Sequence, residues 1–250
     1  AQYLGEDGQM YTQENAAPVQ QGDTIWGTAG GETWYVANGT VTIENRVKVT
    51  GDVHLILANS AALTVNGGIE VGEGNSFTVY AQSTEESEMG SLEAKAATDS
   101  DEAGIGGGQF GTGGEMTIIG GKVTATGAEY SAGIGGGLLG SGGKVTVYGG
   151  VVNATGTMTS TGPGAGIGGG YNGAGGSVMI TGGKVTATGG KNSAGIGTGD
   201  SGTGGSFSVS GAGTVVWATS ISDQTGKANG TWQGMVYEGS KGCVYGNVQL

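Results

Sequence analysis

Apolar and polar residues alternate in short stretches along the chain, beginning at Trp34. Each stretch carries two apolar residues separated by one other residue, which places both side chains on one face of a short β-strand. The first six pairs are Val41/Ile43, Val47/Val49, Leu55/Leu57, Leu63/Val65, Ile69/Val71 and Phe77/Val79. Glycine and asparagine turns such as Asn38-Gly39 lie between the pairs, so the pattern predicts many short strands joined by tight turns.

Every third pair repeats at a fixed distance. Val41 and Leu63, Val47 and Ile69, and Leu55 and Phe77 are each 22 residues apart. Three strands in each coil of about 22 residues predict a three-sided parallel β-helix, an all-β solenoid whose coils pair about 4.8 Å apart. We expect a right-handed helix, because parallel crossover connections take that hand.

A glycine-rich motif marks longer coils in the second half of the chain. The sequence AGIGGG occupies residues 103–108, 132–137 and 165–170, and AGIGTG occupies residues 194–199. The isoleucines Ile105, Ile134, Ile167 and Ile196 are 29, 33 and 29 residues apart. Two columns of apolar pairs move with them, Met116/Ile118, Val145/Val147, Val178/Ile180 and Phe207/Val209 in one, and Val123/Ala125, Val152/Ala154, Val185/Ala187 and Val215/Trp217 in the other. The motif is therefore expected to form the third strand of coils of about 29 residues.

The periodic pattern divides the chain into two parts. Residues 1–32 are polar and irregular, and we expect them to form an N-terminal arm or cap that protects the open end of the solenoid. Residues 33–250 are predicted to form the β-helix. Because the pattern stops at Leu250 without closing, we expect the chain to be cut from a longer multidomain protein.

Composition excludes several classes of function. The 250 residues include 60 glycines but only 2 prolines, which argues against collagen and against a disordered Pro/Gly linker. A net charge of −12 disfavours binding to nucleic acid or to an anionic membrane surface. No apolar run of 18 residues is present, so no membrane-spanning helix is expected. Single residues of cysteine (Cys243) and histidine (His54) argue against disulfide frameworks, zinc sites and Ser-His or Cys-His pairs.

Acidic residues precede the first two glycine motifs. Asp99, Asp101 and Glu102 lie before the first motif and Glu129 lies before the second, so stacking of coils would bring these carboxylates together. Such a group could bind Ca²⁺, could serve as the acid–base pair of a polysaccharide-cleaving enzyme, or could be a solvated turn. The scarcity of basic residues weakens a lyase mechanism, since Arg46, the only arginine, is expected to lie several coils away.

Two further sets of residues could contact a ligand. If Val123 and Ala125 point inward, threonine and asparagine form two outward ladders on the same strands, which would provide a polar platform for sugar chains or an ice-binding-like surface, or simply reflect the preference of threonine for strands. The ladder threonines are Thr124, Thr126, Thr155, Thr186 and Thr188. Tyr130 and Tyr171 are expected on turns beside the glycine motifs, where aromatic rings could stack against sugars.

The order of these motifs resembles a known family. The stretches TGDVHLIL (50–57) and LTVNGGI (63–69), the tandem AGIGGG and GGKVTATGG units and the closing VYGNV (244–248) are similar to a glycine-rich β-helix module of large Firmicutes surface proteins. The resemblance covers residues 33 to 250. It implies an extracellular, cell-wall-associated location and a carbohydrate-binding or adhesin-like role, by analogy with pectate-lyase-like β-helices.

These observations lead to one functional prediction with alternatives. We expect a monomeric, non-catalytic carbohydrate-binding or adhesive module of an extracellular bacterial surface protein, with a polysaccharide or other glycan as its partner. The alternatives are a lyase or glycoside hydrolase that uses the acidic corner, and a structural stalk or ice-binding-like surface. No cofactor is expected apart from the candidate calcium ion.

Overall fold

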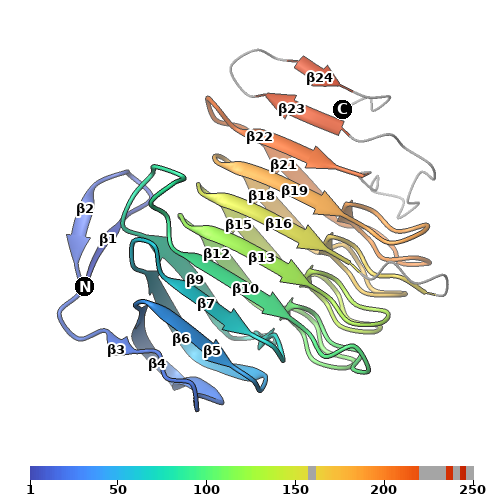
Figure 1. Cartoon of the computed structure of the whole chain (residues 1–250). Helices are drawn as coiled ribbons and strands as arrows, with labels where there is room; N and C mark the ends of the chain where they lie inside the picture. Colours follow the sequence, from blue (N-terminus) through green and yellow to red (C-terminus); the bar gives the residue numbers. More distant parts are fainter. Residues whose placement is uncertain (157–161, 220–234, 239–242, 246–250) are drawn as a thin grey trace.

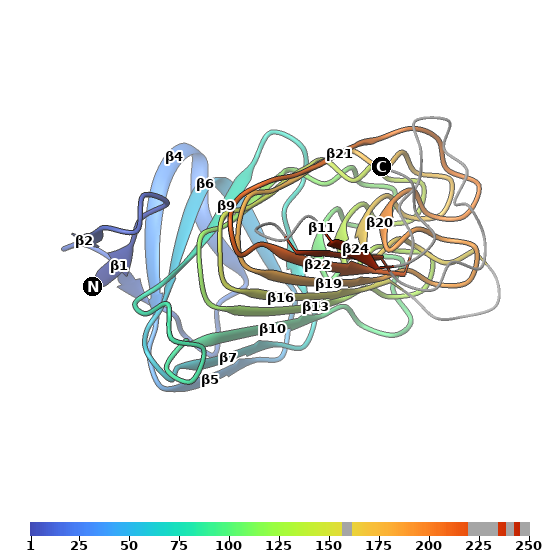
Figure 2. The same cartoon turned by 90° about the horizontal axis from the view of Figure 1, so that it is seen from above.

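The computed structural model describes residues 1–156, 162–219, 235–238 and 243–245. Its parallel strands stack coil upon coil and form three faces. Figure 1 shows the stack from the side, and Figure 2 shows it from above. The described part of the chain contains no helix long and apolar enough to cross a membrane.

The threonine face is a single run of strands in which each pairs in parallel with the next. It contains β5 (Thr40–Ile43), β7 (Ala62–Val65), β10 (Ser91–Lys95), β13 (Lys122–Thr126), β16 (Val151–Thr155), β19 (Lys184–Thr188) and β22 (Val215–Ala218). The antiparallel strands β23 (Met235–Glu238) and β24 (Cys243–Tyr245) continue this sheet beyond β22.

The other two faces are joined at the N-terminal end, because β4 (Ile25–Ala37) and β6 (Val47–Leu57) run through the corner between them. The glycine face continues from the first halves of these strands as β8 (Ile69–Glu70), β11 (Ile105–Gly106), β14 (Ile134–Gly135), β17 (Ile167–Gly168) and β20 (Ile196–Gly197). The third face, here called the hairpin face, comprises β3 (Ala17–Pro18), the second halves of β4 and β6, β9 (Ser76–Ala81), β12 (Glu115–Ile118), β15 (Lys144–Val147), β18 (Ser177–Ile180) and β21 (Ser206–Val209).

The predicted three-sided parallel β-helix is therefore confirmed. Val41 pairs with Leu63 and Val47 pairs with Ile69, as the 22-residue repeat requires. In the longer coils Val123 pairs with Val152, and the four isoleucines of the glycine motif form one continuous row. The apolar pairs of all three faces form a single buried core. The threonine face contributes the small side chains of Ala94, Ala125, Ala154 and Ala187 to it.

The prediction that Leu55 stacks on Phe77 was wrong by two residues. Leu55 pairs with Val79, and Phe77 pairs with Val53. The reason is the corner before each strand: β6 passes through it as a continuous strand, whereas the next coil makes a turn between β8 and β9 that is two residues longer.

The prediction that Val215 and Trp217 of the threonine face point inward was also wrong; the strand has the opposite parity, that is, the alternate residues point inward. Val216 and Ala218 pair with Val185 and Ala187 and are fully buried, whereas Trp217 points outward and is 37% exposed. All four residues of β22 are apolar, so their pattern fits either parity. The turn between β21 and β22 then sets which residues point inward.

The N-terminal residues are organised differently in two segments. β1 (Gln2–Leu4) and β2 (Met10–Thr12) form an antiparallel hairpin that lies against β9 on the hairpin face (Figure 1). β3 pairs with β4, and the first half of β4 pairs with β6. The boundary expected at residue 32 therefore falls inside a strand of the parallel sheet.

Candidate functional site

The glycine strands allow successive coils to approach through their backbones alone. The φ angles of Gly106, Gly135, Gly168 and Gly197 lie between 133° and 138°, a region that other residues rarely adopt. A Cβ atom at Gly106 would lie 2.0 Å from the carbonyl oxygen of Gly135, and the same clash recurs in the next two coils. These glycines are buried, so the motif itself offers no surface to a ligand.

Two loops extend from each glycine strand and meet on its outer side. In Figure 2 they form the rim of the solenoid beyond β11 and β20. The loop that follows one glycine strand donates to the loop that precedes another: Leu138 N–H donates to Asp101 O at 3.0 Å, Tyr171 N–H to Tyr130 O at 2.8 Å, and Asp200 N–H to Pro163 O at 3.0 Å. We call this region the paired-loop edge; it comprises residues 99–102 and 108–111, 128–131 and 137–140, 162–164 and 170–173, and 190–193 and 199–202.

Four equivalent turns form the tip of the edge. Each turn has glycine at both ends and a residue in the left-handed region at its third position. These residues are Phe110, Leu139, Asn172 and Ser201, with φ of 60°, 61°, 58° and 61°. Phe110 is 61% exposed and Leu139 is 50% exposed, so two large apolar side chains are held in water on adjacent coils.

The two predicted tyrosines come together at this edge. The ring centroids of Tyr130 and Tyr171 are 5.9 Å apart and the rings are inclined at 59°. Both tyrosines are half-buried, and a Cβ atom at Gly162 would contact both rings. Polar groups lie nearby: Gln109 Nε2 donates to Asp101 Oδ2 at 2.8 Å, and Asn172 is exposed on the same row of turns.

Arg46 changes the interpretation of the acidic corner. Arg46 was expected several coils away, but its Nε lies 3.5 Å from Glu102 Oε1. Its Nη1 donates to the carbonyl oxygens of Gly67 and Ala103, both at 3.0 Å, and its Nη2 donates to that of Gly107 at 3.3 Å. Burial lowers the pKa of Arg46, while the carboxylates of Glu102 and Glu70 oppose this shift. Arg46 therefore links three successive coils at this corner and neutralises Glu102.

The remaining predicted carboxylates do not form one cluster. Asp99 is exposed, Asp101 accepts from Gln109, and the backbone oxygen of Glu129 accepts from the hydroxyl of Ser131. Among the described residues there is no group of three or more aspartate, glutamate, histidine or cysteine side chains that could hold a metal ion. The corner therefore supplies one neutralised carboxylate and several separate ones.

The threonine ladders lie where the sequence predicts them. Thr124 pairs with Asn153 and Asn153 with Thr186, while Thr126, Thr155 and Thr188 form the parallel row. The five threonines are partly exposed and Asn153 is exposed. Trp217 pairs with Thr186 and continues the first ladder, so an exposed indole stands at its end. Trp217 was predicted to lie in the core, so it was absent from the predicted ligand-binding residues.

A second concave region lies on the N-terminal side of the edge, at the corner between β4, β6 and β9. It is a cleft of about 760 Å³, and its lining includes Glu32, Asp52 and Ser76. Ser76 Oγ donates to Asp52 Oδ1, and His54 Nε2 lies 3.4 Å from Asp52 Oδ2. Serine is thus hydrogen-bonded to the carboxylate rather than to the imidazole, so the order differs from that of a nucleophilic triad.

Comparison with known proteins supports the fold alone. Residues 117–138, 145–171 and 178–200 match a family model described as a β-helix repeat. No curated protein and no solved structure matches the chain. The matched segments span β12 to β20, the coils that carry most of the paired-loop edge, and they agree with the parallel pairing of those strands. The chain is thus a parallel β-helix that contains β-helix repeats.

Proposed function

We propose that the chain is a non-catalytic carbohydrate-binding or adhesive module that holds a polysaccharide along the paired-loop edge. The observation that carries this proposal is the contact between Tyr130 and Tyr171 on successive coils, beside the exposed Phe110 and Leu139. Sugar rings present apolar C–H faces that stack on aromatic side chains, and their hydroxyls need nearby hydrogen-bonding groups. Gln109, Asp101 and Asn172 supply such groups on the same row of turns.

The arrangement favours a polymer over a small sugar. Equivalent turns recur from coil to coil at the spacing of paired strands, about 4.8 Å, so contacts repeat along the solenoid axis. A linear glycan lying along that axis would meet one turn after another. Repetition of weak contacts along one chain raises the total affinity without a deep pocket.

The charge at the edge favours a neutral glycan. Asp99, Asp101, Glu129 and Asp200 lie on these loops against one exposed lysine, Lys191, and the guanidinium of Arg46 is occupied by Glu102 and by backbone carbonyls. A uronate-rich polysaccharide would therefore face like charge. This also weighs against a lyase, and the engagement of Glu102 with Arg46 weighs against its use as a free acid or base.

The threonine face provides a second surface for the same ligand class. Its ladders of hydroxyl and amide groups end at the exposed indole of Trp217, which combines hydrogen-bonding groups with a stacking surface. Strands of this face lead directly into the loops that carry Tyr130, so one glycan could contact both. Ice binding is less well supported, because Asn153 and Trp217 interrupt the threonine row.

The resemblance to Firmicutes surface modules supports an extracellular location for this activity. We propose that the module acts as a monomer at the cell surface, where it attaches its parent protein to a glycan. We propose no resident cation.

A glycan array followed by calorimetry with the best neutral polysaccharide tests the proposal. Phe110→Ala and Tyr171→Ala should each weaken binding at least tenfold. Ile25→Ala removes an apolar side chain of similar exposure, 60% against 61% for Phe110, from β4, which lies outside the paired-loop edge, and should leave affinity unchanged. A blank array, or equal affinity in all three variants, would refute glycan binding at this edge and favour the alternative of a structural stalk. Release of reducing ends or unsaturated products from the bound polysaccharide would instead establish an enzyme.

A further inference from the structure

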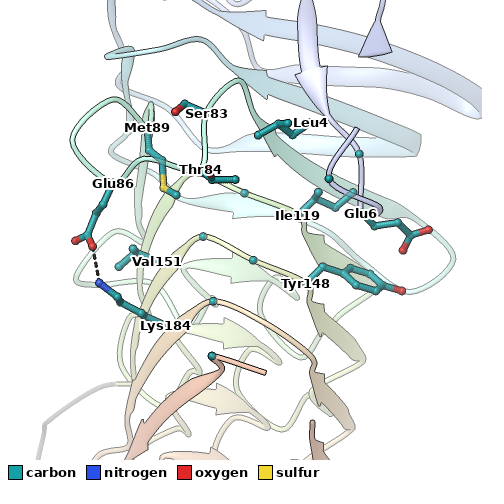
Figure 3. A pocket seen from close by; sticks show the side chains of 17 residues that line it. Leu4, Glu6, Ser83, Thr84, Glu86, Met89, Ile119, Tyr148, Val151 and Lys184 are labelled. Carbon is teal, nitrogen blue, oxygen red and sulfur yellow. Dashed lines mark hydrogen bonds and ion pairs between the residues drawn. The ribbon is translucent and has the colours of Figure 1, made fainter. Parts of the chain in front are cut away.

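A groove separate from the paired-loop edge runs beside the hairpin face (Figure 3). Its volume is about 400 Å³, which lies in the range of ligand-binding pockets. One wall is the turn between β1 and β2, and the other is the loop of residues 83–89 between β9 and β10. The floor consists of the glycine corners through which the hairpin face turns into the threonine face.

Side-chain contacts fix both walls in position. Tyr3 of the hairpin packs against Trp34 at 5.0 Å and against Tyr80 at 4.7 Å between ring centroids, and Gln82 Nε2 donates to Gln2 O at 3.0 Å. In the other wall, Glu86 forms an ion pair of 2.7 Å with Lys184, which lies 98 residues away in sequence (Figure 3). The groove is therefore preformed, which lowers the entropic cost of binding.

The inside of the groove is mainly apolar. Leu4, Met89, Ile119 and Val151 reach into it from four different segments (Figure 3). Such walls suit an aliphatic or aromatic side chain and offer little to sugar hydroxyls. The ligand of this groove therefore differs in class from the glycan proposed for the paired-loop edge.

The rim of the groove is acidic. Glu6 lies in the hairpin wall and has no ion-pair partner within the described residues, and Asp7 follows it. Burial and a hydrogen bond to Glu6 raise the pKa of Tyr148, so the phenol stays neutral beside that carboxylate. Glu85, Glu86 and Glu88 lie in the opposite wall, where Lys184 and Lys122 act on Glu86, so the acidic residues of the wall outnumber the lysines. The rim thus attracts a cation, as expected from charge complementarity.

The floor sets the length of the ligand. Gly120, Gly149, Gly183 and Gly213 occupy corners of four successive coils. Three steps of about 4.8 Å give roughly 14 Å, which equals about four residues of extended peptide at about 3.4 Å each.

We propose that this groove binds a short extended segment of a protein partner in which apolar residues alternate with lysine or arginine. The apolar side chains enter between Leu4, Met89 and Val151, and the cations lie against Glu6 and the acidic loop. Alternation follows from the extended backbone, which points successive side chains to opposite sides. The site is independent of the proposed glycan-binding edge and would add a protein partner to a carbohydrate-binding module.

Fluorescence polarisation with labelled tetrapeptides tests this proposal on the full chain. The peptide acetyl-KLKL-amide should bind at least tenfold more tightly than acetyl-ELEL-amide, which reverses the charge, and than acetyl-KSKS-amide, which lacks the apolar side chains. Raising the salt concentration from 50 to 500 mM should weaken KLKL binding severalfold, because exposed charges are screened. Equal binding of KLKL and ELEL would overturn the charge argument and the proposal with it.

Matched variants locate the binding. Glu6→Gln and Val151→Thr preserve side-chain shape and should each weaken KLKL binding about three- to tenfold, whereas Glu14→Gln, an exposed carboxylate outside the groove, should have no effect. Unchanged affinity in both groove variants, with melting temperatures equal to the parent, would contradict the proposal. Leucinamide that binds as tightly as KLKL would indicate a small-amine site and would equally refute a peptide site. Glycan affinity should be the same in all these variants, so failure here is distinct from failure of the proposed function.

Discussion

Single residues at the tips of the paired-loop edge violate a local backbone preference. Phe110 and Leu139 adopt left-handed φ angles that cost an ordinary side chain about 1–2 kcal/mol, although the residue that follows each of them is glycine. Glycine would fit there with less strain, whereas an exposed phenyl ring adds no core contact. Conflict between local preference and observed residue is typical of functional positions.

Replacement of Phe110 by glycine tests that conflict. Relief of about 1–2 kcal/mol of strain, reduced by about 0.5–1 kcal/mol for the greater freedom of glycine in the unfolded chain, should stabilise the protein by up to about 1.5 kcal/mol. Binding of the neutral glycan should weaken at least tenfold in the same variant. Urea denaturation and calorimetry measure the two effects. Phe110→Ala keeps the strained backbone, so it should lose affinity without gaining stability; a gain in both properties for Phe110→Gly would refute a role for the ring.

Contacts between individual side chains were the hardest feature to predict from the sequence. The spacing of Tyr130 and Tyr171 was sufficient to place both near the glycine strands. The spacing of Arg46 and Glu102 was not, because their contact depends on a long side chain that crosses an intervening coil. Gly67 and Gly68 leave the room for it, and a Cβ atom at Gly68 would lie 2.8 Å from Arg46 Nη1. No periodic pattern encodes such a crossing.

At the scale of the strand, alternation determines which side chains fill the core. Ala154 of β16 is buried in the column of small side chains, and its neighbour Asn153 points outward on the threonine ladder. Because neighbouring coils fix the backbone on both sides, this column has little room for a larger residue.

Leucine substitutions at these two adjacent positions should have opposite outcomes. Ala154→Leu overpacks the core and should destabilise the protein by about 1–3 kcal/mol. Asn153→Leu changes an exposed side chain and should alter stability by no more than about 0.5 kcal/mol. Chemical denaturation of both variants gives the comparison. Similar losses at the two positions would mean that β16 does not have the observed parity.

Strand parity explains which predictions of register succeeded. Where polar residues alternate strictly with apolar ones, as in KVTAT of β13 and β19, the inward face was correctly predicted. In β22 the sequence VVWA has no polar residue to mark the outer face, and the assignment failed. The consequence was functional, because the exposed Trp217 was hidden among predicted core residues. Lengths of the turns decide such cases, and turn length is the least regular feature of this solenoid.

For the whole molecule, most stabilising contacts join each coil to its neighbours, which is why a repeat in the sequence was enough to predict the solenoid. Two segments are exceptions. Tyr3 of the β1–β2 hairpin contacts side chains of β4 and β9, and Glu86 of the loop between β9 and β10 reaches Lys184 across several coils. Those contacts have no period. The groove that they enclose therefore could not be predicted from the sequence, although the coils beneath it could.

Removal of residues 1–13 tests whether the repeating coils are stable without the non-periodic contacts of the hairpin. The deletion abolishes the ring contacts of Tyr3 with Tyr11, Trp34 and Tyr80, each worth about 0.5–1.5 kcal/mol, and one wall of the groove. We expect a loss of about 2–4 kcal/mol and a melting temperature roughly 4–16 °C lower, because a chain of this size loses about 2–4 °C per kcal/mol. The circular dichroism spectrum of the β-helix and the affinity for the glycan should persist, whereas KLKL binding should fall at least tenfold. Tyr11→Ala removes one of those ring contacts and the hydrogen bond to Asp7 but no residue of the groove lining, and should retain peptide binding. If the deletion instead unfolds the parallel sheet, the hairpin is part of the folding unit rather than an addition to a solenoid that is stable without it.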